Sequence, residues 1–401
     1  MKLLYICHRY PFPPNRGGKI RPFQMIQHLS KKHSVTVASL AHTAQELRDG
    51  ECLKKHCAEA LGEVLPNAVR WIQAGLRLPS LTPSSVAYFR SSRLARRVGD
   101  IWREGKFDGL MVHCAFAAQY ALELEGGFRI LDFGDIDSAK WLDYSRFRRF
   151  LLSVGYGLEA RKLRRYEKRV AQHFDHITVT TQGESEEFKT FGVDKPCTVI
   201  PNGVDSGYFS SQPTAKSASP VIVFLGRMDY FPNIEGICRF AREIFPQIRA
   251  AVPTALLRIV GSDPVASVRH LATVPGVAVT GFVPDVRPFI QDAAVAVAPL
   301  RIARGTQNKI LQCMAMGIPV VSSSEAAKGI QAVPGENILV ADGPGAFANS
   351  VINVLQDEGL RIRISDAGRQ QVQRAHQWAN SMKILDGVLA QCTDTASRRS
   401  S

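Results

Sequence analysis

The chain has 401 residues, 45% of them hydrophobic and 21% charged, with a formal net charge of +14. No run of about 18 apolar residues is present, which excludes a helical integral membrane protein. Charge and proline interrupt the first 14 residues before a signal-peptide core can form, so we expect a cytoplasmic protein. The positive charge favours anionic partners, but no helix-turn-helix or basic-and-aromatic cluster supports nucleic acid as one of them.

The eight cysteines contain no CxxC pair, which predicts reduced thiols in a chain that needs no disulfide framework. Cys52, His56 and Cys57 lie close together, but a C-x4-C pair with one histidine is weak evidence for zinc. We therefore predict no metal site.

The first half alternates apolar runs with helical patterns. The expected helices include 20–32 and a basic one at 156–173, and the expected strands are 2–7, 34–40, 109–113, 128–132, 175–180 and 197–200. The loop after the first strand, "CHRYPFPPNRGGKIR", places Gly17 and Gly18 before Lys19 and Arg21 at the start of a helix. Adjacent glycines and a helix N-terminus allow close approach to an anion, although a loop tip that binds nothing is the alternative.

Polar residues follow two later strands of this half. His113 ends one strand, and Asp132, Asp135 and Asp137 cluster where the next strand meets its loop. The histidine could serve a site or be satisfied by a backbone carbonyl in the core. The aspartates could orient hydroxyl groups, act as a base or suggest Mg²⁺.

The second half repeats strand and helix more regularly. Its expected helices are 233–251, 265–274, 285–293, 307–317 and 344–356, between strands at 221–226, 255–261, 277–283, 295–300, 318–323 and 338–341. Strands rich in Val, Ile and Leu between amphipathic helices predict parallel sheets covered on both faces. We expect an α/β protein with two Rossmann-like, doubly wound domains facing across a cleft, and ligands at the carboxyl ends of the strands.

The predicted boundaries are 1–207 for the N-terminal, acceptor-side domain and 208–375 for the C-terminal, nucleotide-sugar-binding domain. A Ser/Pro-rich surface linker is expected at 206–220, between the two. Residues 376–401 are expected to form a helix that packs back toward the N-terminal domain and ends in a disordered tail.

Five motifs carry a resemblance to a known family: "RGGKIR", "TVIPNGVDSGYF" (198–209), "FLGRMDYFPNIEG" (224–236), "GFVPDVRPF" (281–289) and "NKILQCMAMGIPVV" (308–321). In this order the chain resembles the family 4 retaining glycosyltransferases of the GT-B fold. Within that family it is most similar to the sugar transferases associated with exosortase and PEP-CTERM systems, which share the "MDYFPN" and "RGxQNK" wording. The resemblance covers nearly the whole chain.

The resemblance implies a set of site residues. Arg227 and Lys309 would hold the donor pyrophosphate and, with His113 near the donor sugar or its phosphate, make up the catalytic set. Acceptor binding would fall to Lys19, Arg21, Asp132 and Asp135. The implied donor-binding residues are Gly17, Gly18, Arg304, Gly305, Gln307, Asn308, Gln312 and Asp285. Fixed cations and helix N–H groups can stabilise a leaving diphosphate without a metal or other cofactor.

Three positions depart from the family pattern. Asn233 stands where many members have a second lysine, and Arg304 and Gln312 replace two glutamates spaced E-x7-E. Glutamine can still bond ribose hydroxyls, but without charge assistance. The mouth of the 307–317 helix thus carries Arg304, Gln307, Asn308 and Lys309 and no carboxylate.

The resemblance implies transfer of a sugar, with retention, from a UDP- or GDP-linked donor to a glycan or lipid-linked glycan in exopolysaccharide biosynthesis. A nucleotide-sugar epimerase of the same fold and a catalytically inactive GT-B binding or scaffold protein are the alternatives. The segment 145–170 has nine Lys/Arg and two Glu among apolar residues. Such a helix suits peripheral contact with anionic membrane at the inner face of the cytoplasmic membrane, or a solvated face on a packed helix.

Overall fold

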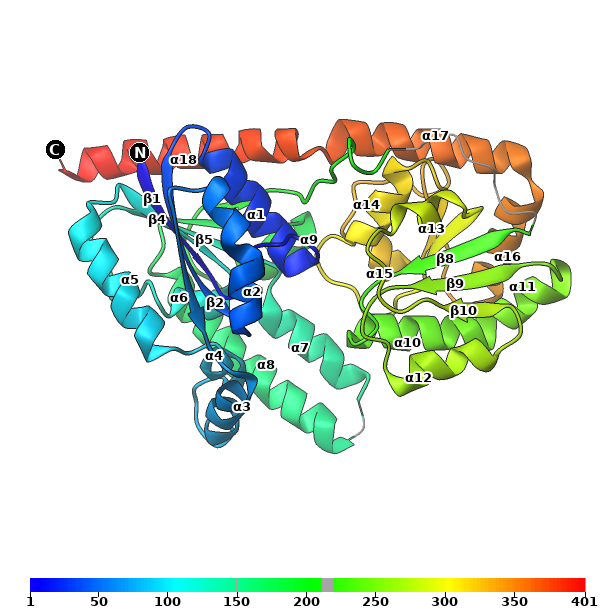
Figure 1. Ribbon diagram of the computed structural model, residues 1–401, viewed down its shortest axis with the longest axis horizontal. Coiled ribbons are helices and arrows are strands. Elements are labelled where there is room, and N and C mark those ends of the chain that lie inside the picture. Colours follow the sequence, from blue (N-terminus) through cyan, green and yellow to red (C-terminus); the bar gives the residue numbers. More distant parts are fainter. Residues whose placement is uncertain (149, 211–218, 401) are drawn as a thin grey trace. The chain divides into compact units, whose positions relative to one another are not determined.

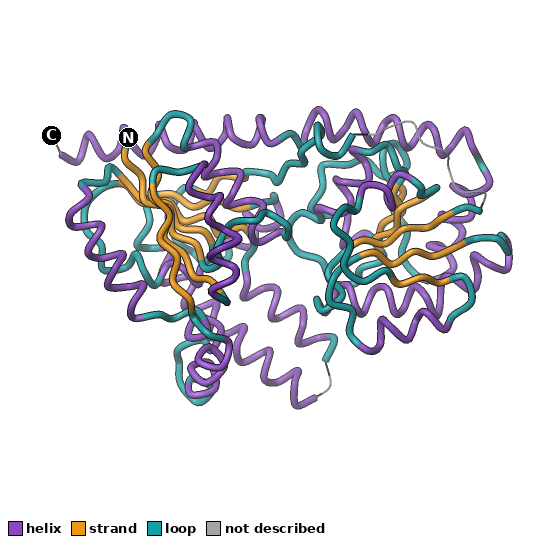
Figure 2. The backbone as a smooth tube through the Cα atoms, in the orientation of Figure 1, coloured by secondary structure: helices purple, strands orange, loops and turns teal. Residues whose placement is uncertain are grey.

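The computed structural model describes residues 1–148, 150–210 and 219–400 (Figures 1 and 2). These residues form two compact units. The N-terminal unit comprises Met1–Pro201 and Met382–Ser401, and the C-terminal unit comprises Asn202–Ser381. Residues 211–218, on which most of the predicted Ser/Pro linker falls, lie outside the described residues.

The N-terminal unit is built on a seven-stranded parallel sheet in the order β3-β2-β1-β4-β5-β6-β7. The interior strand β1 pairs Leu3 with Val35 of β2 on one side and with Gly109 of β4 on the other. The strands are β1 (Lys2–Cys7), β2 (Ser34–Ala41), β3 (Glu59–Val64), β4 (Gly109–His113), β5 (Phe128–Gly134), β6 (His176–Val179) and β7 (Cys197–Val199). The edge strand β3 was not predicted, because its sequence, EALGEV, contains a single β-branched residue.

Helices cover both faces of this sheet (Figure 2). Two long ones are α5 and α8, and α8 includes most of the predicted basic helix. The helices are α1 (Gly17–Leu29), α2 (Ala44–Asp49), α3 (Asn67–Leu76), α4 (Ser84–Tyr88), α5 (Ser92–Gly105), α6 (Ala115–Ala118), α7 (Asp137–Arg146), α8 (Phe150–Ala171) and α9 (Gln182–Lys189), with a 3₁₀ helix at Gly50–Lys55.

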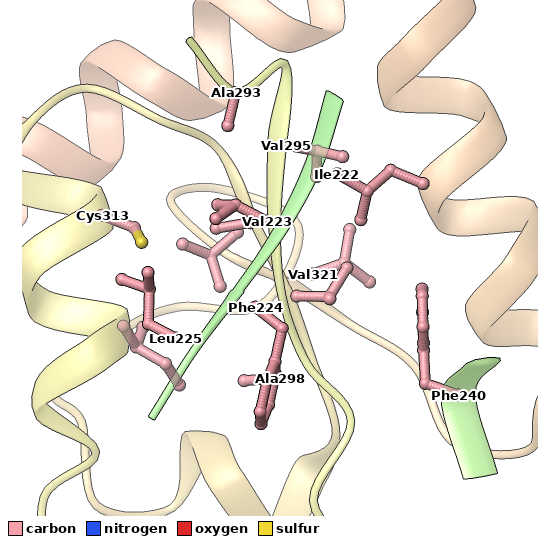
Figure 3. Packing of buried hydrophobic residues seen from close by; sticks show 14 of the residues in the cluster. Ile222, Val223, Phe224, Leu225, Phe240, Ala293, Val295, Ala298, Cys313 and Val321 are labelled. Carbon is pink, nitrogen blue, oxygen red and sulfur yellow. The ribbon is translucent and has the colours of Figure 1, made fainter. Parts of the chain in front are cut away.

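The C-terminal unit contains a six-stranded parallel sheet in the order β10-β9-β8-β11-β12-β13. Its core is continuous: side chains from β8, β11 and β12 pack with Phe240 and Cys313 (Figure 3). The strands are β8 (Val221–Leu225), β9 (Leu256–Val260), β10 (Val277–Val279), β11 (Val295–Ala298), β12 (Val320–Ser322) and β13 (Leu339–Val340). Burial on both faces explains why these strands read as Val/Ile runs.

The predicted helix at 233–251 is three elements: α10 (Phe231–Arg239), a π-helical turn (Phe240–Ile244) and α11 (Phe245–Ala251). Pro246 lacks an N–H and so cannot continue a regular α-helical ladder through this point. The other helices of the unit are α12 (Ala266–Arg269), a 3₁₀ helix (His270–Thr273), α13 (Arg287–Gln291), α14 (Asn308–Ala315), α15 (Ser324–Ala327), α16 (Pro344–Gln356) and α17 (Glu358–Ala375).

The last helix, α18 (Trp378–Ser400), joins the N-terminal unit from Met382 onward. There His28 lies 2.7 Å from the carboxylate of Asp386. Because α18 continues to Ser400, the predicted disordered tail falls on residue 401, which lies outside the described residues. Among the helices of the described ranges, none combines the length and apolar character that a bilayer crossing requires.

Candidate functional site

The strongest candidate in the C-terminal unit lies where β8 and β9 end. Gly226 follows β8 and Gly261 follows β9, with φ of +151°. A Cβ atom on Gly261 would stand 1.7 Å from the carbonyl oxygen of Gly226, so the two loops touch through their backbones. A Cβ atom on Gly226 would stand 3.2 Å from Lys309 Nζ. Glycine is therefore required here for close approach, both of the loops and of the lysine.

Lys309 lies in the first turn of α14 and points to the same place. Its Nζ donates to Asn233 Oδ1 at 2.5 Å and lies 4.4 Å from the centre of the Phe224 ring. Asn233 Nδ2 in turn donates to the carbonyl oxygen of Arg227 at 2.8 Å. Burial lowers the pKa of Lys309 to about 7. Asn233 thus holds the Lys309 side chain in place.

Arg227 is the second cation predicted at this site, and its guanidinium forms ion pairs with two carboxylates. Its guanidinium lies 2.5 Å from Asp229 and 3.2 Å from Asp263, and its side chain is 37% exposed. A ligand phosphate would have to compete with both aspartates for this arginine. Neither aspartate was singled out from the sequence, although Asp229 stands two residues after the arginine.

The mouth of α14 is formed by a tight loop. Gly305 has φ of +61°, and a Cβ on Gly329 would come within 1.8 Å of its carbonyl oxygen. Next to it, Thr306 Oγ1 and Asn308 Oδ1 are buried and have no hydrogen-bond partner among the described residues. Gln307 Nε2 donates to the carbonyl oxygen of Arg304 at 3.1 Å. Buried polar atoms without partners are uncommon in folded proteins, so this loop has free capacity for a polar ligand.

Two further predicted donor residues differ in their surroundings. Gln312 is half-buried on α14, one turn after Asn308. Asp285 is engaged locally: Arg287 donates to its carboxylate at 2.7 and 3.0 Å, and the Tyr208 hydroxyl lies 3.4 Å away. The hydrogen bond with Arg287 lowers the pKa of Asp285.

In the N-terminal unit, Asp132 is the centre of a buried polar network. Arg21 donates to it through Nε at 3.0 Å and NH2 at 2.7 Å, and Thr178 Oγ1 donates at 2.8 Å. His113 Nδ1 lies 2.8 Å from Asp132 Oδ2, the oxygen that also accepts from Arg21 Nε. Burial alone would raise the pKa of Asp132, but the charge of Arg21 and the His113 hydrogen bond hold it well below its ordinary value.

Three of the four predicted acceptor residues are buried. Arg21 and Asp132 are 2% and 0% exposed and bond to each other, which suits positioning of His113 better than direct contact with an acceptor. Lys19 is also buried, with Nζ 2.6 Å from Glu46. The fourth, Asp135, is half-buried and accepts from Thr180 Oγ1 at 2.9 Å. Gly17 and Gly18 are exposed at the start of α1.

His8 was missed by the sequence analysis. It follows β1, it is 8% exposed, and its Nδ1 has no hydrogen-bond partner in the described part of the chain. Its ring centre lies 5.8 Å from that of His113, and burial lowers its pKa well below the ordinary value. Because β1 and β4 are neighbours, the ends of both strands meet at one edge, and this rule could have paired the two histidines.

The described residues contain no group of three or more His, Cys, Asp or Glu arranged to hold a metal ion. Asp137 takes part in a different cluster, where Cys114 Sγ lies 3.4 Å from its carboxylate. Burial, with the charge of Asp137 nearby, raises the pKa of Glu167 to about 8. Burial likewise raises the pKa of Cys57 to about 11, which keeps that thiol protonated.

Two parallel-sheet, Rossmann-like units with candidate ligand groups at the carboxyl ends of their strands define the GT-B class of fold. Residues 16–208 match the model described as Glycosyltransferase Family 4, and residues 219–357 match the model described as Glycosyl transferases group 1. Between them, the two matches leave only the ends of the chain and a short connection unmatched. The chain is a glycosyltransferase of the GT-B fold.

Solved structures share this fold at low identity. Sucrose-phosphate synthase from Thermosynechococcus elongatus is 16% identical with a TM-score of 0.72, covering 98% of this chain and 100% of that one. HepE of Anabaena, solved in complex with UDP, is 15% identical with a TM-score of 0.70 over the same shares. The lipopolysaccharide outer core galactosyltransferase WaaB is 14% identical with a TM-score of 0.59, also over these shares. A search of curated proteins finds no match.

Proposed function

We propose that the protein transfers a sugar from a UDP- or GDP-linked donor to a glycan or lipid-linked glycan, with retention and without a metal ion. The observation that carries the proposal is Lys309. Its ammonium group lies beside Gly226 at the start of α14, where no carboxylate stands in the first helical turn. A cation and unpaired helix N–H groups together suit a diphosphate.

The chemistry assigned to this site is stabilisation of the leaving group. Negative charge grows on the nucleoside diphosphate as the sugar–phosphate bond breaks, and preorganised cations lower the energy of that transition state. Lys309 is the first of these and Arg227, once released from its two aspartates, the second. Thr306 and Asn308 supply polar atoms at the same loop, and Gln312 is assigned to the ribose hydroxyls. Complexes of HepE with UDP and with UDP-glucose support a donor of this kind.

In the N-terminal unit, we assign His113 to the donor sugar or its phosphate. Asp132, fixed by Arg21 and Thr178, orients the imidazole and sets which nitrogen carries the proton, by the same logic as other carboxylate–histidine pairs. Asp135 remains assigned to the acceptor. In a retaining reaction of this type no protein nucleophile is expected: the acceptor oxygen bonds to the anomeric carbon as the sugar–phosphate bond breaks, and the leaving phosphate takes the acceptor proton.

The resemblance to exosortase-associated sugar transferases supports the further proposal that the reaction belongs to exopolysaccharide biosynthesis, at the inner face of the cytoplasmic membrane. Lipid-linked glycans made there present their sugars at the membrane surface. The proposed donor site does not depend on the proposed pathway or location, so it can be tested separately.

The test is a transfer assay with UDP- and GDP-sugars and extracted lipid-linked acceptors. We expect Lys309→Ala and Arg227→Ala each to lower transfer more than tenfold, since removal of one charge-stabilising donor commonly costs about 3 kcal/mol. Arg242→Ala, an exposed cation of the same unit, is the control and should leave the rate unchanged. Near wild-type rates in both site variants would refute the donor-site assignment.

Two outcomes separate the alternatives. Conversion of the nucleotide sugar without acceptor would identify an epimerase, and tight donor binding with no turnover would identify an inactive binding protein. Nuclear magnetic resonance of the product's anomeric proton decides retention: an anomeric configuration opposite to that of the donor would contradict it.

A further inference from the structure

The N-terminal unit exposes apolar side chains on α3 and on the loop that follows it. Five large ones lie within 11 residues, and each is between 62% and 82% exposed: Trp71, Ile72, Leu76, Leu78 and Leu81. The opposite side of α3 is buried through Arg70 and Ala74. Single exposed apolar residues are normal on protein surfaces, but a contiguous group of this size marks a binding surface.

The first turns of α8 expose a second group. Between 49% and 83% of each of these side chains is accessible: Phe150, Leu151, Leu152, Val154 and Leu158. Farther along, α8 buries one side in the unit, through residues that include Leu163 and Val170. On its other side the start of the helix packs on α7, where the Tyr156 ring lies 5.1 Å from that of Trp141.

The two groups lie on neighbouring elements, because the middle of α8 is bonded to the segment after α3. Lys162 Nζ donates to the carbonyl oxygen of Leu78 at 2.7 Å, and Ser85 of α4 donates through N and Oγ to Glu159 at 2.8 and 2.7 Å. Figure 1 shows α3, α4 and α8 beside one another at one end of the N-terminal unit. We call these ten apolar side chains the α3–α8 surface.

The exposed charges around the α3–α8 surface are mainly cations. Residues 64–99 contain six arginines and no aspartate or glutamate. Of these arginines, Arg70 is buried, and Arg93 and Arg97 face Glu63. The two glutamates of α8, Glu159 and Glu167, are 7% and 0% exposed, so its exposed charges are cations. Apolar side chains with surrounding cations are the combination that binds an anionic bilayer.

A hollow of about 300 Å³ lies beside α3 and is lined by Gln73, Leu76, Arg77, Ala87, Arg90 and Ser92. Arg77 and Arg90 are exposed, and within the described ranges neither guanidinium forms an ion pair. Two cations next to a leucine match a lipid phosphate next to its acyl chain. A second copy of this chain would bring like charges together across a two-fold axis, which disfavours it as the occupant.

We propose that the α3–α8 surface docks the N-terminal unit on an anionic phospholipid bilayer, with its apolar side chains entering the acyl boundary and Arg77 and Arg90 binding lipid phosphates. This deepens the proposed function, since it rests on that function for its purpose: it brings the enzyme to lipid-linked acceptors. The docking itself requires no sugar transfer.

Co-sedimentation with vesicles tests the docking. We expect the full-length protein to bind vesicles of equal parts phosphatidylcholine and phosphatidylglycerol, to bind pure phosphatidylcholine at least about tenfold more weakly, and to lose most binding in high salt. Ile72→Ser/Leu76→Ser should lower the partition coefficient about tenfold or more, because two apolar side chains no longer enter the bilayer. Its control is Val333→Ser/Ile362→Ser, which removes two exposed apolar side chains from the C-terminal unit.

The charge test is Arg77→Gln/Arg90→Gln against Arg242→Gln/Arg363→Gln, which removes the same charge from exposed positions of the C-terminal unit. A loss confined to the first pair supports docking at this surface, and equal losses would show non-specific attraction and overturn it. Failure of the wild type to bind, or a concentration-dependent dimer that Ile72→Ser/Leu76→Ser abolishes, would also overturn it. Circular dichroism and binding of UDP-glucose show whether each variant is folded, so loss of docking is distinguishable from failure of the proposed transfer.

Discussion

The low pKa of Lys309 makes donor affinity depend on pH. In the free protein the Lys309 residue is half-buried, and burial lowers its pKa to about 7. A bound pyrophosphate favours the charged form, so the pKa in the complex should return toward its ordinary value of about 10.4. Donor binding is then coupled to proton uptake above pH 7, and affinity falls as the pH rises.

The magnitude follows from this difference. The fraction of free protein with a charged Lys309 falls from about nine-tenths at pH 6 to about one-tenth at pH 8, which weakens binding about tenfold, or about 1.4 kcal/mol. Calorimetric titration with UDP-glucose measures this, because the diphosphate of a nucleotide sugar is a diester with no proton to lose in that range. The variant series below isolates the contribution of the lysine.

Lys309→Met should bind weakly at every pH and lose the slope, and Lys309→Arg should keep the charge without the slope, since a guanidinium stays protonated. Arg242→Gln is the control and should retain the wild-type slope. If the wild type and Lys309→Met show the same pH dependence, the coupling of this lysine to the diphosphate is refuted.

Three further outcomes are expected. Lys309→Met should raise the free energy of unfolding at pH 7, measured by urea titration, by at most about 4 kcal/mol. The reason is that the unfolded wild-type chain binds the lysine proton more tightly than the folded chain between pH 7 and about 10.4. The gain in stability should therefore shrink as the pH rises through that window. Arg21→Met should cost about 3–5 kcal/mol of stability by leaving the buried Asp132 charged and without its guanidinium partner, and a larger loss in Arg21→Met/Asp132→Asn would contradict this. Gln312→Glu should tighten UDP-glucose binding about fivefold by adding a charge-assisted bond to ribose, whereas unchanged affinity would count against the ribose assignment.

The two sheets show which strands local sequence patterns can predict. Buried parallel strands require continuous Val, Ile and Leu, so the fold class and most strands could be predicted, and two parallel-sheet Rossmann-like units confirm the class. The edge strand β3 could not, because an edge needs less burial and its sequence carries little β propensity. The π-helical turn after α10 was also missed, because spacing alone does not reveal how a helix accommodates Pro246.

Residue types at strand ends and helix starts, such as Lys309 and His113, were visible in the sequence because they follow the alternation of strand and helix. Only the tertiary structure decided which of these groups bond to one another. Asp132 meets Arg21 across 111 positions, and Lys309 meets Asn233 across 76. A parallel sheet gathers the ends of distant strands at one edge, so the partners, burial and pKa of each polar group depend on strand order, which local sequence does not encode.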